Sequence, residues 1–164
     1  MIMVVGLMHR FSRFCTLLAL LCLALGQARA ATLKEARQLY ATGEYAKAIK
    51  ASEAAIAANE YDSGWRLLLL RARLTPGEYP EARQFATELL KDYRYRSNAE
   101  ALWLFHLAYE ANGDAAQAGQ MLQVIMQFLN GQRGISDENT LIFIGRALLK
   151  AAATDPKQVK ENLF

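Results

Sequence analysis

Cysteine and histidine are scarce in this chain, and their positions restrict its chemistry further. The 164 residues include two cysteines and two histidines. Both cysteines (Cys15 and Cys22) and one histidine (His9) lie within the N-terminal segment 1–30. If that segment is removed, the remainder has no thiol and a single imidazole, at His106. Cysteine catalysis, disulfides and metal sites built from several Cys or His ligands are therefore excluded from residues 31–164.

Proline is also scarce, and most of the chain lacks a net charge. Three prolines and an apolar content of 53% argue against wholesale disorder, and the length fits one domain. The formal charge of +3 comes from Arg10, Arg13 and Arg29, which lie in a segment without acidic residues. Residues 31–164 contain 16 basic and 16 acidic side chains, so this part of the chain is neutral.

Residues 1–30 have the order of a secretory signal peptide. Two arginines precede an uncharged apolar run at 14–25, and the small residues Ala28 and Ala30 follow it. We expect cleavage after Ala30 and export to the periplasm or beyond, an oxidising compartment. The run is shorter than the roughly 20 residues that span a bilayer. The alternatives are an uncleaved anchor and a lipoprotein modified at Cys22, which the large leucine before it disfavours.

One pattern recurs along the rest of the chain at a nearly constant interval. Three segments share it: GEYAKA at 43–48, GEYPEA at 77–82 and GDAAQA at 113–118. Their opening glycines recur at an interval of about 34 residues, and the second interval is slightly longer than the first. Apolar residues recur at helical intervals on both sides of each segment. Each segment therefore predicts the turn between two helices.

The residues of this pattern have separate roles. The glycine permits the left-handed conformation that ends a helix, and the acid after it complements the dipole of the next helix. Pro80 falls in a first helical turn, where its missing N–H costs little. The small residues Ala48, Ala82 and Ala118 stand where two antiparallel helices must approach closely.

This pattern resembles the tetratricopeptide repeat (TPR), a helix–turn–helix unit of about 34 residues. The resemblance covers about residues 31–130 as three repeats, and it implies an all-α solenoid of three to four repeats. Trp65 lies one place off the family's aromatic position. Arg73 and His106 replace an aromatic and a small residue, and Ala115 replaces a tyrosine. We therefore expect altered packing angles in the second and third repeats.

Residues 131–164 read as a degenerate fourth helical pair. A turn-rich loop is expected at 130–134, and a helix over 140–152 after a cap at 136–139. Its predicted apolar face consists of Leu141, Ile144, Leu148 and Leu149. A further helix is expected after Asp155-Pro156. Because repeat arrays need a polar cap, either this last helix folds back onto the fourth pair or the pair is truncated.

The sequence offers little for catalysis, and we predict a non-enzymatic chain without cofactor or metal. His106 is the one physiological base in the segment 31–164, and we expect it packed between the two helices of the third repeat with one hydrogen bond. Helix-surface, turn or cap positions are expected for the serines: Ser52, Ser63, Ser97 and Ser136. Solvated helix starts account for the carboxylate pairs: Glu78 with Glu81, and Glu35 with Glu44.

The segment KDYRYR at 91–96 interleaves aromatic and basic residues, as nucleic-acid binders often do. It is short and lies in a neutral chain, so we predict no nucleic-acid partner. We expect a turn between repeats in which both tyrosines pack inward and the arginines are solvated. The alternative is an interaction patch.

The inner wall of the array gives the candidate site. In TPR arrays the first helix of each pair lines a concave groove. Alignment on the turn glycines predicts the partner-binding residues Leu33, Arg37, Tyr40, Leu67, Arg71, Trp103 and Glu110, with Leu74 and Leu107 in the same rows. Arginines would bind carboxylates, and aromatic residues would bind apolar anchors. Alternatively, Leu67, Leu74 and Trp103 are simply core. The family's lysine–asparagine carboxylate clamp is not supported, since only Lys34 lies nearby.

These patterns predict an interaction scaffold of the cell envelope. The partner is a protein or peptide segment held in the groove, and a membrane is involved only through an uncleaved leader. The alternatives are the N-terminal TPR region of a larger envelope protein or enzyme whose activity lies outside this chain, and a membrane-tethered scaffold.

Overall fold

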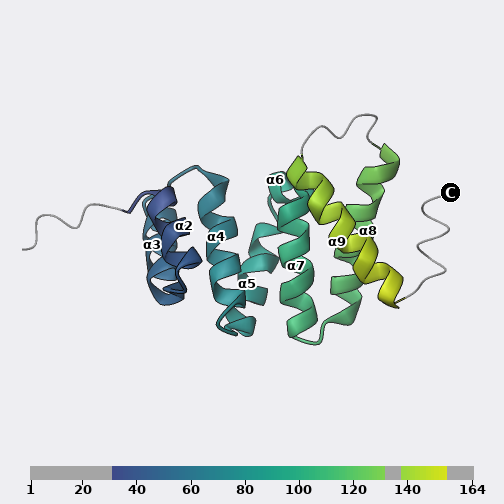
Figure 1. Ribbon diagram of the computed structural model, residues 1–164, viewed down its shortest axis with the longest axis horizontal. Coiled ribbons are helices and arrows are strands. Elements are labelled where there is room, and N and C mark those ends of the chain that lie inside the picture. Colours follow the sequence, from purple (N-terminus) through teal and green to yellow (C-terminus); the bar gives the residue numbers. More distant parts are fainter. Residues whose placement is uncertain (1–30, 132–137, 155–164) are drawn as a thin grey trace, which may run out of the picture. The chain divides into compact units, whose positions relative to one another are not determined.

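The computed structural model describes residues 31–131 and 138–154, and this part of the chain is all-α. The expected signal peptide, the residues 136–137 of the expected cap and the helix expected after Asp155 lie outside the described residues. The helices are α2 (Leu33–Ala41), α3 (Tyr45–Ala57), α4 (Ser63–Leu74), α5 (Tyr79–Leu89), α6 (Tyr93–Arg96), α7 (Ala99–Ala111), α8 (Ala115–Gly131) and α9 (Glu138–Thr154). Figure 1 shows them in chain order.

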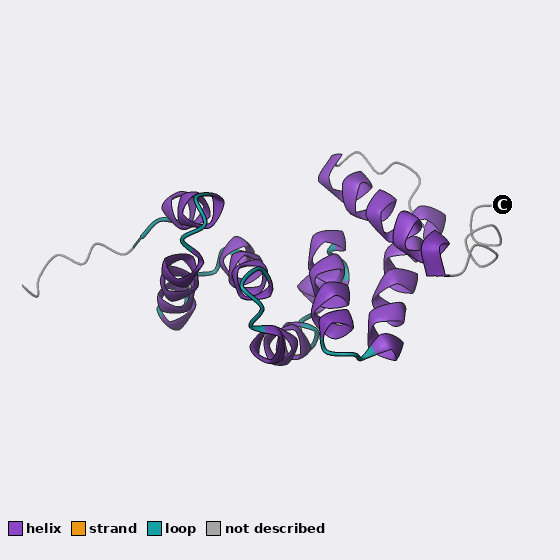
Figure 2. Cartoon of the chain, turned by 60° about the horizontal axis from the view of Figure 1, so that its bottom comes forward, coloured by secondary structure: helices purple, strands orange, loops and turns teal. Residues whose placement is uncertain are grey.

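Six of these helices form three consecutive pairs: α2 with α3, α4 with α5, and α7 with α8. Short turns, drawn in teal in Figure 2, join the two helices of each pair. Helices joined by such short turns run antiparallel. Neighbouring pairs also touch, because α4 packs on α2 and α3, and α7 packs on α4 and α5. Helix α9 then packs across α7 and α8.

The three turn glycines adopt the left-handed conformation that the sequence predicts. Their φ angles are +83° at Gly43, +94° at Gly77 and +77° at Gly113. After each glycine, the next backbone N–H donates to a carbonyl five residues earlier, at 2.8–2.9 Å. This bond satisfies one of the free carbonyls at the end of the first helix. The sequence pattern thus corresponds to one repeated backbone turn.

The two helices of a pair begin differently. The first helix of each pair has a side-chain cap, in which Thr32, Asp62 or Asn98 accepts a hydrogen bond from a backbone N–H. At Thr32 the Glu35 carboxylate also accepts from the cap's own N–H, which completes a capping box. The second helices α3 and α5 have no side-chain cap bond and begin directly from the glycine turn.

The core lies between the pairs, and the predicted small residues are inside it. Ala48 and Ala82 are fully buried and Ala118 nearly so, as expected where helices approach closely. The largest cluster joins α4, α5, α7, α8 and α9 around Leu70, Phe105 and similar apolar side chains. A smaller cluster around Ala36, Trp65 and Leu68 joins α2 to α4. Trp65 is therefore a core residue despite its shifted position in the repeat.

The segment with interleaved tyrosines and arginines is a short helix, α6, and the prediction for it was half wrong. Tyr95 is 2% exposed and packs in the main core, whereas Tyr93 is 74% exposed. Residues two positions apart on a helix point in nearly opposite directions, so the two tyrosines cannot both face the core. Arg94 pairs with Asp92 at 2.6 Å and Arg96 is exposed, as expected for solvated arginines.

The predictions for the C-terminal part need two corrections. First, α8 continues to Gly131, so the expected loop cannot begin at Asn130. Second, the buried face of α9 consists of Phe143, Ile144, Ala147 and Ala151. Of the predicted face, Ile144 is buried and Leu148 half-buried, but Leu141 and Leu149 are exposed. The helix meets α7 and α8 with a face rotated from the one that its leucines suggest.

Arg73 shows how the fold accommodates a departure from the repeat pattern. Its guanidinium carbon lies 5.6 Å from the ring centre of Phe85 on α5. A guanidinium nitrogen also lies 2.6 Å from the Glu53 carboxylate on α3. The planar, charged group thus packs on an aromatic face at a position where the sequence resemblance leads us to expect an aromatic side chain.

Candidate functional site

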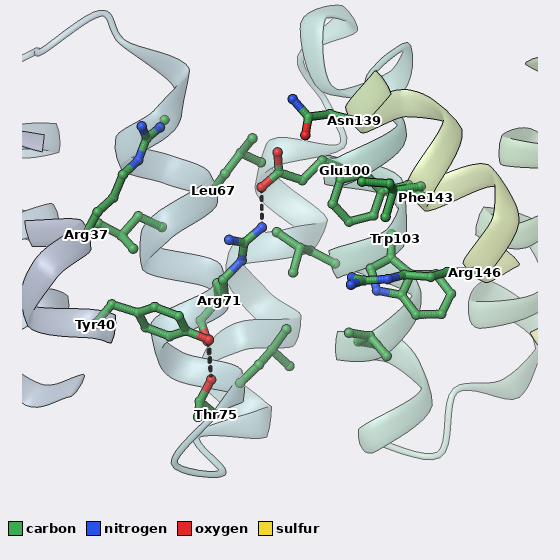
Figure 3. Close-up of a pocket in the computed structure, with 16 residues that line it drawn as sticks. Arg37, Tyr40, Leu67, Arg71, Thr75, Glu100, Trp103, Asn139, Phe143 and Arg146 are labelled. Atoms are coloured by element: carbon green, nitrogen blue, oxygen red, sulfur yellow. Dashed lines mark hydrogen bonds and ion pairs between the residues drawn. The ribbon is translucent and has the colours of Figure 1, made fainter. Parts of the chain in front are cut away.

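Four helices surround a groove of about 880 Å³. Arg37 and Tyr40 reach it from α2, Leu67 and Arg71 from α4, and Trp103 from α7 (Figure 3). The fourth contributor is the N-terminal half of α9. Helices α2, α4 and α7 are the first helices of the three pairs, and α9 adds a fourth side. The groove therefore follows the wall on which the sequence placed the candidate site.

The structure brings five of the seven predicted groove residues together: Arg37, Tyr40, Leu67, Arg71 and Trp103. Leu74 and Leu107, which share their rows, also line the groove. The other two lie elsewhere. Leu33 packs against the small core cluster of α2 and α4, and Glu110 lines a second cavity. Glu110 is one helical turn beyond Leu107 on α7, where the helix has already passed the groove.

Positive charge predominates in the groove. Arg37, Arg71 and Arg146 line it, and the one carboxylate among its lining residues is that of Glu100. Arg71 pairs with Glu100 across the α4–α7 contact, with an N–O distance of 2.5 Å. Within the described residues, neither Arg37 nor Arg146 forms an ion pair with a carboxylate. The groove therefore has two guanidinium groups that are available to pair with an anionic ligand.

The apolar residues of the groove also belong to the core. Leu67 is buried in the main cluster, and Leu74 and Trp103 pack against that cluster while half exposed. The two expectations for these residues, groove and core, therefore describe two faces of the same side chains. Tyr40 adds a polar edge, because its hydroxyl lies 3.0 Å from that of Thr75.

Helix α9 supplies groove residues that the repeat alignment missed: Asn139, Ile142, Phe143 and Arg146. The guanidinium of Arg146 lies 5.4 Å from the ring centre of Phe143, which orients both groups. The alignment could not place them, because α9 follows the third turn and carries no turn glycine of its own. The half-buried Glu100 was missed as well, although it lies one turn before Trp103 on α7.

His106 occupies the place expected between α7 and α8. It is 2% exposed, and its Nδ1 lies 3.1 Å from the carbonyl oxygen of Ala118. Because a carbonyl can only accept, Nδ1 carries the proton in this bond. Burial lowers the pKa of His106; the bond to Ala118 and the charge of Glu110 act in the opposite direction, and Lys150 lowers it further. The imidazole is therefore neutral at physiological pH.

The other candidates for chemistry do not converge on a site. Ser63 and Ser97 are exposed at helix ends, as expected. The prediction for Ser52 was wrong, because its side chain is fully buried on α3. Within the described residues, no three acidic, histidine or cysteine side chains cluster in a way that could hold a metal ion.

Comparisons with models of protein families, with curated proteins and with solved structures find no significant match to this chain. Among the helices that the structure describes, none has the length and apolarity needed to cross a membrane.

Proposed function

We propose that this chain is a non-enzymatic, TPR-like scaffold of the cell envelope that binds an acidic, partly apolar segment of a partner protein in the groove. The observation that carries the proposal is the pair of arginines without carboxylate partners among the described residues, Arg37 on α2 and Arg146 on α9. They lie on opposite sides of the groove in Figure 3. A segment with carboxylates at both ends of the groove would pair with both.

The groove also has the apolar surface that such a segment needs. Trp103 and Phe143 supply aromatic surface beside Arg146 (Figure 3), and Leu107 and Ile142 add apolar lining. Buried aromatic anchors supply most of the free energy at protein interfaces, and charged groups supply specificity. An alternation of acidic and apolar side chains in the partner fits this distribution.

The repeated turn supports the TPR-like part of the proposal. Three turn glycines with positive φ follow each other at nearly equal intervals, and each is followed by the same backbone hydrogen bond. The alanines Ala48, Ala82 and Ala118 allow close helix approach at matching positions. An array of this kind holds its inner wall rigid, so binding costs little reorganisation of the scaffold.

The first test compares two short fluorescent peptides, one alternating Glu with Leu and one alternating Lys with Leu. We expect the acidic peptide to bind and the basic peptide not to. Reversal of both free charges, Arg37→Glu with Arg146→Glu, should weaken acidic-peptide binding by roughly a hundredfold, about 1.4 kcal/mol for each contact.

The matched control is Lys50→Glu with Lys91→Glu, which makes the same change in net charge at exposed positions outside the groove. We expect a change of about threefold or less, from long-range attraction alone. Equal binding of the two peptides, or equal weakening by both double variants, would contradict the proposal.

A second variant separates the groove from the core. Alanine at both Trp103 and Arg71 should abolish capture of the acidic peptide while helicity, measured by circular dichroism, is retained. Trp103 is only half-buried and Arg71 partly exposed, so the pairs can remain folded without them. Loss of helicity in this variant would show that these side chains are structural, and would count against the groove as the binding site.

A second candidate is that the chain is the repeat region of a larger envelope protein, and the surface of α9 favours it. Leu149 is 76% exposed and Leu141 is also exposed, so this helix has apolar surface to which further protein can pack. The intact mass of the native protein from a cell-envelope fraction tests both export and this candidate. A mass matching residues 31–164 supports an exported free scaffold, and a larger mass supports the second candidate or a retained leader.

A further inference from the structure

A second, smaller cavity lies between α7, α8 and α9. Its volume is about 260 Å³. Its walls are mainly apolar and include Ala118, Leu122 and Met126 of α8 and Ala151 of α9. An apolar protein cavity of about 150 Å³ is large enough for benzene. The cavity therefore has room for a ring or short chain with a substituent.

One buried polar atom of this cavity lacks a partner. His106 lines the cavity, and its Nδ1 is used by the carbonyl of Ala118. Within the described residues, Nε2 has no hydrogen-bond partner. The nearest acidic oxygen is that of Glu110, at 3.6 Å, and a carboxylate has no proton to donate. A neutral imidazole with Nδ1 protonated leaves a lone pair on Nε2, and buried acceptors of this kind normally have a donor.

The charges around the cavity balance each other. Glu110 and Lys150 both line it, and a carboxylate oxygen of Glu110 lies 2.8 Å from Nζ of Lys150. With His106 neutral, the lining carries no net charge, so a charged ligand would enter without a counter-charge. Lys150 has three N–H donors and uses one for Glu110. The site therefore offers one acceptor and free donors to an uncharged group that both donates and accepts.

We propose that this cavity binds a small uncharged molecule with an apolar body and one hydroxyl group. The hydroxyl donates to Nε2 of His106 and accepts from Nζ of Lys150, while the apolar body fills the space beside Leu122 and Met126. An aliphatic amine would be protonated and charged, and a plain hydrocarbon would leave Nε2 without a donor. The site is separate from the groove and takes a different class of ligand.

Two glycines make the proposal testable without removal of a core side chain. Gly119 on α8 lines the cavity, and a Cβ atom built there meets no atom within 4 Å. Gly119→Leu therefore fills the cavity from a helical position that has room for a side chain. Gly145 on α9 also has open space for a Cβ and lines neither the cavity nor the groove. Gly145→Leu is the matched control.

The experiment titrates the full-length, ¹⁵N-labelled chain with phenol and, separately, with toluene, and follows the nuclear magnetic resonance signals of α7–α9 and of the His106 ring. We expect saturable phenol binding in the parent chain and in Gly145→Leu, and none in Gly119→Leu. Toluene should bind roughly tenfold more weakly, since it lacks the donor for Nε2. In His106→Phe the affinities for phenol and toluene should be about equal.

Three results would overturn the proposal. Phenol binding that persists in Gly119→Leu would place the ligand elsewhere. Equal affinity for phenol and toluene would show that Nε2 takes no part. No saturable binding by the parent chain would leave the cavity as a space for water. If His106→Phe does not fold, the comparison of phenol with toluene in the parent chain still decides the role of Nε2.

Discussion

The side-chain nitrogen of Asn112 donates a hydrogen bond of 2.8 Å to the main-chain carbonyl oxygen of Tyr79. Asn112 follows the last residue of α7, and Tyr79 is the first residue of α5. The same nitrogen donates to the carbonyl of Ala108, also at 2.8 Å, so both of its protons are used. One amide group thus joins the second helical pair to the end of the first helix of the third pair.

We expect Asn112→Ala to lower the free energy of unfolding by about 1–2 kcal/mol, because two carbonyl groups lose a donor at a contact between pairs. Urea denaturation followed by circular dichroism measures the change. The control is Gln84→Ala at an exposed position of α5, which should change stability by less than about 0.5 kcal/mol. Equal effects of the two substitutions would mean that the bond contributes nothing of its own.

Ser52 should behave in the opposite way. Its hydroxyl is fully buried on α3 and, within the described residues, has no hydrogen-bond partner. Ser52→Ala removes this group and improves helix propensity, so we expect the free energy of unfolding to rise by about 1 kcal/mol. Thermal denaturation compares it with Ser63→Ala, an exposed serine at the start of α4. A lower melting temperature for Ser52→Ala would show that the hydroxyl is in fact bonded.

The buried histidine predicts a pH dependence of stability. The charged groups that face His106 are Glu110 on its own helix and Lys150 on α9, while α8 contributes the carbonyl of Ala118. Burial, the largest effect, lowers its pKa below the ordinary value of 6.5. The unfolded chain then binds the proton more tightly than the folded chain, so stability is full above pH 6.5 and falls as the pH decreases from there.

Urea midpoints between about pH 7.5 and pH 5 test this expectation, since most carboxylates titrate below that range. The loss should approach about 1.4 kcal/mol for each unit by which the folded pKa lies below the unfolded one. In His106→Gln the midpoint should be nearly constant over the same range. An increase in stability on acidification would mean that the pair with Glu110 outweighs burial.

Glu100 competes with any acidic ligand for Arg71, so its removal should have opposite effects on stability and on binding. The pair is partly exposed, and we expect Glu100→Gln to cost less than about 1 kcal/mol of stability. The affinity for the acidic peptide should rise several-fold, since a third arginine becomes available. Glu53→Gln breaks a comparable pair with Arg73 outside the groove and should leave peptide affinity unchanged. Equal peptide affinities of the parent chain and Glu100→Gln would count against Arg71 as a ligand.

The parts of the fold that could be predicted from sequence are those set by local chemistry. A positive φ angle strongly favours glycine, so Gly43, Gly77 and Gly113 identified three turns that the structure confirms. Close helix approach requires small side chains, and the alanines of the same pattern are buried. Neither inference needs knowledge of distant contacts.

The errors arise where tertiary packing decides. The leucines of α9 suggested one buried face, but packing against α7 and α8 buries Phe143 and Ile144 and leaves Leu149 exposed. Tyr93 and Tyr95 have similar chemistry, and only the position of α6 beside α7 determines which is buried. The groove was half predictable for the same reason: α2, α4 and α7 followed from the repeat, whereas the wall formed by α9 depends on how that helix crosses the others.

Helix α9 lines both the groove and the second cavity. Phe143 and Arg146 face the groove, whereas Lys150 and Ala151 line the second cavity on the following turns. The ring centres of Trp103 and His106, one from each cavity, are 5.2 Å apart on α7. Any displacement of α9 that one ligand favours therefore changes the space open to the other. If both proposed ligands bind, thermodynamic reciprocity requires that each alter the other's affinity by the same factor, so a titration with one ligand would report on the site of the other.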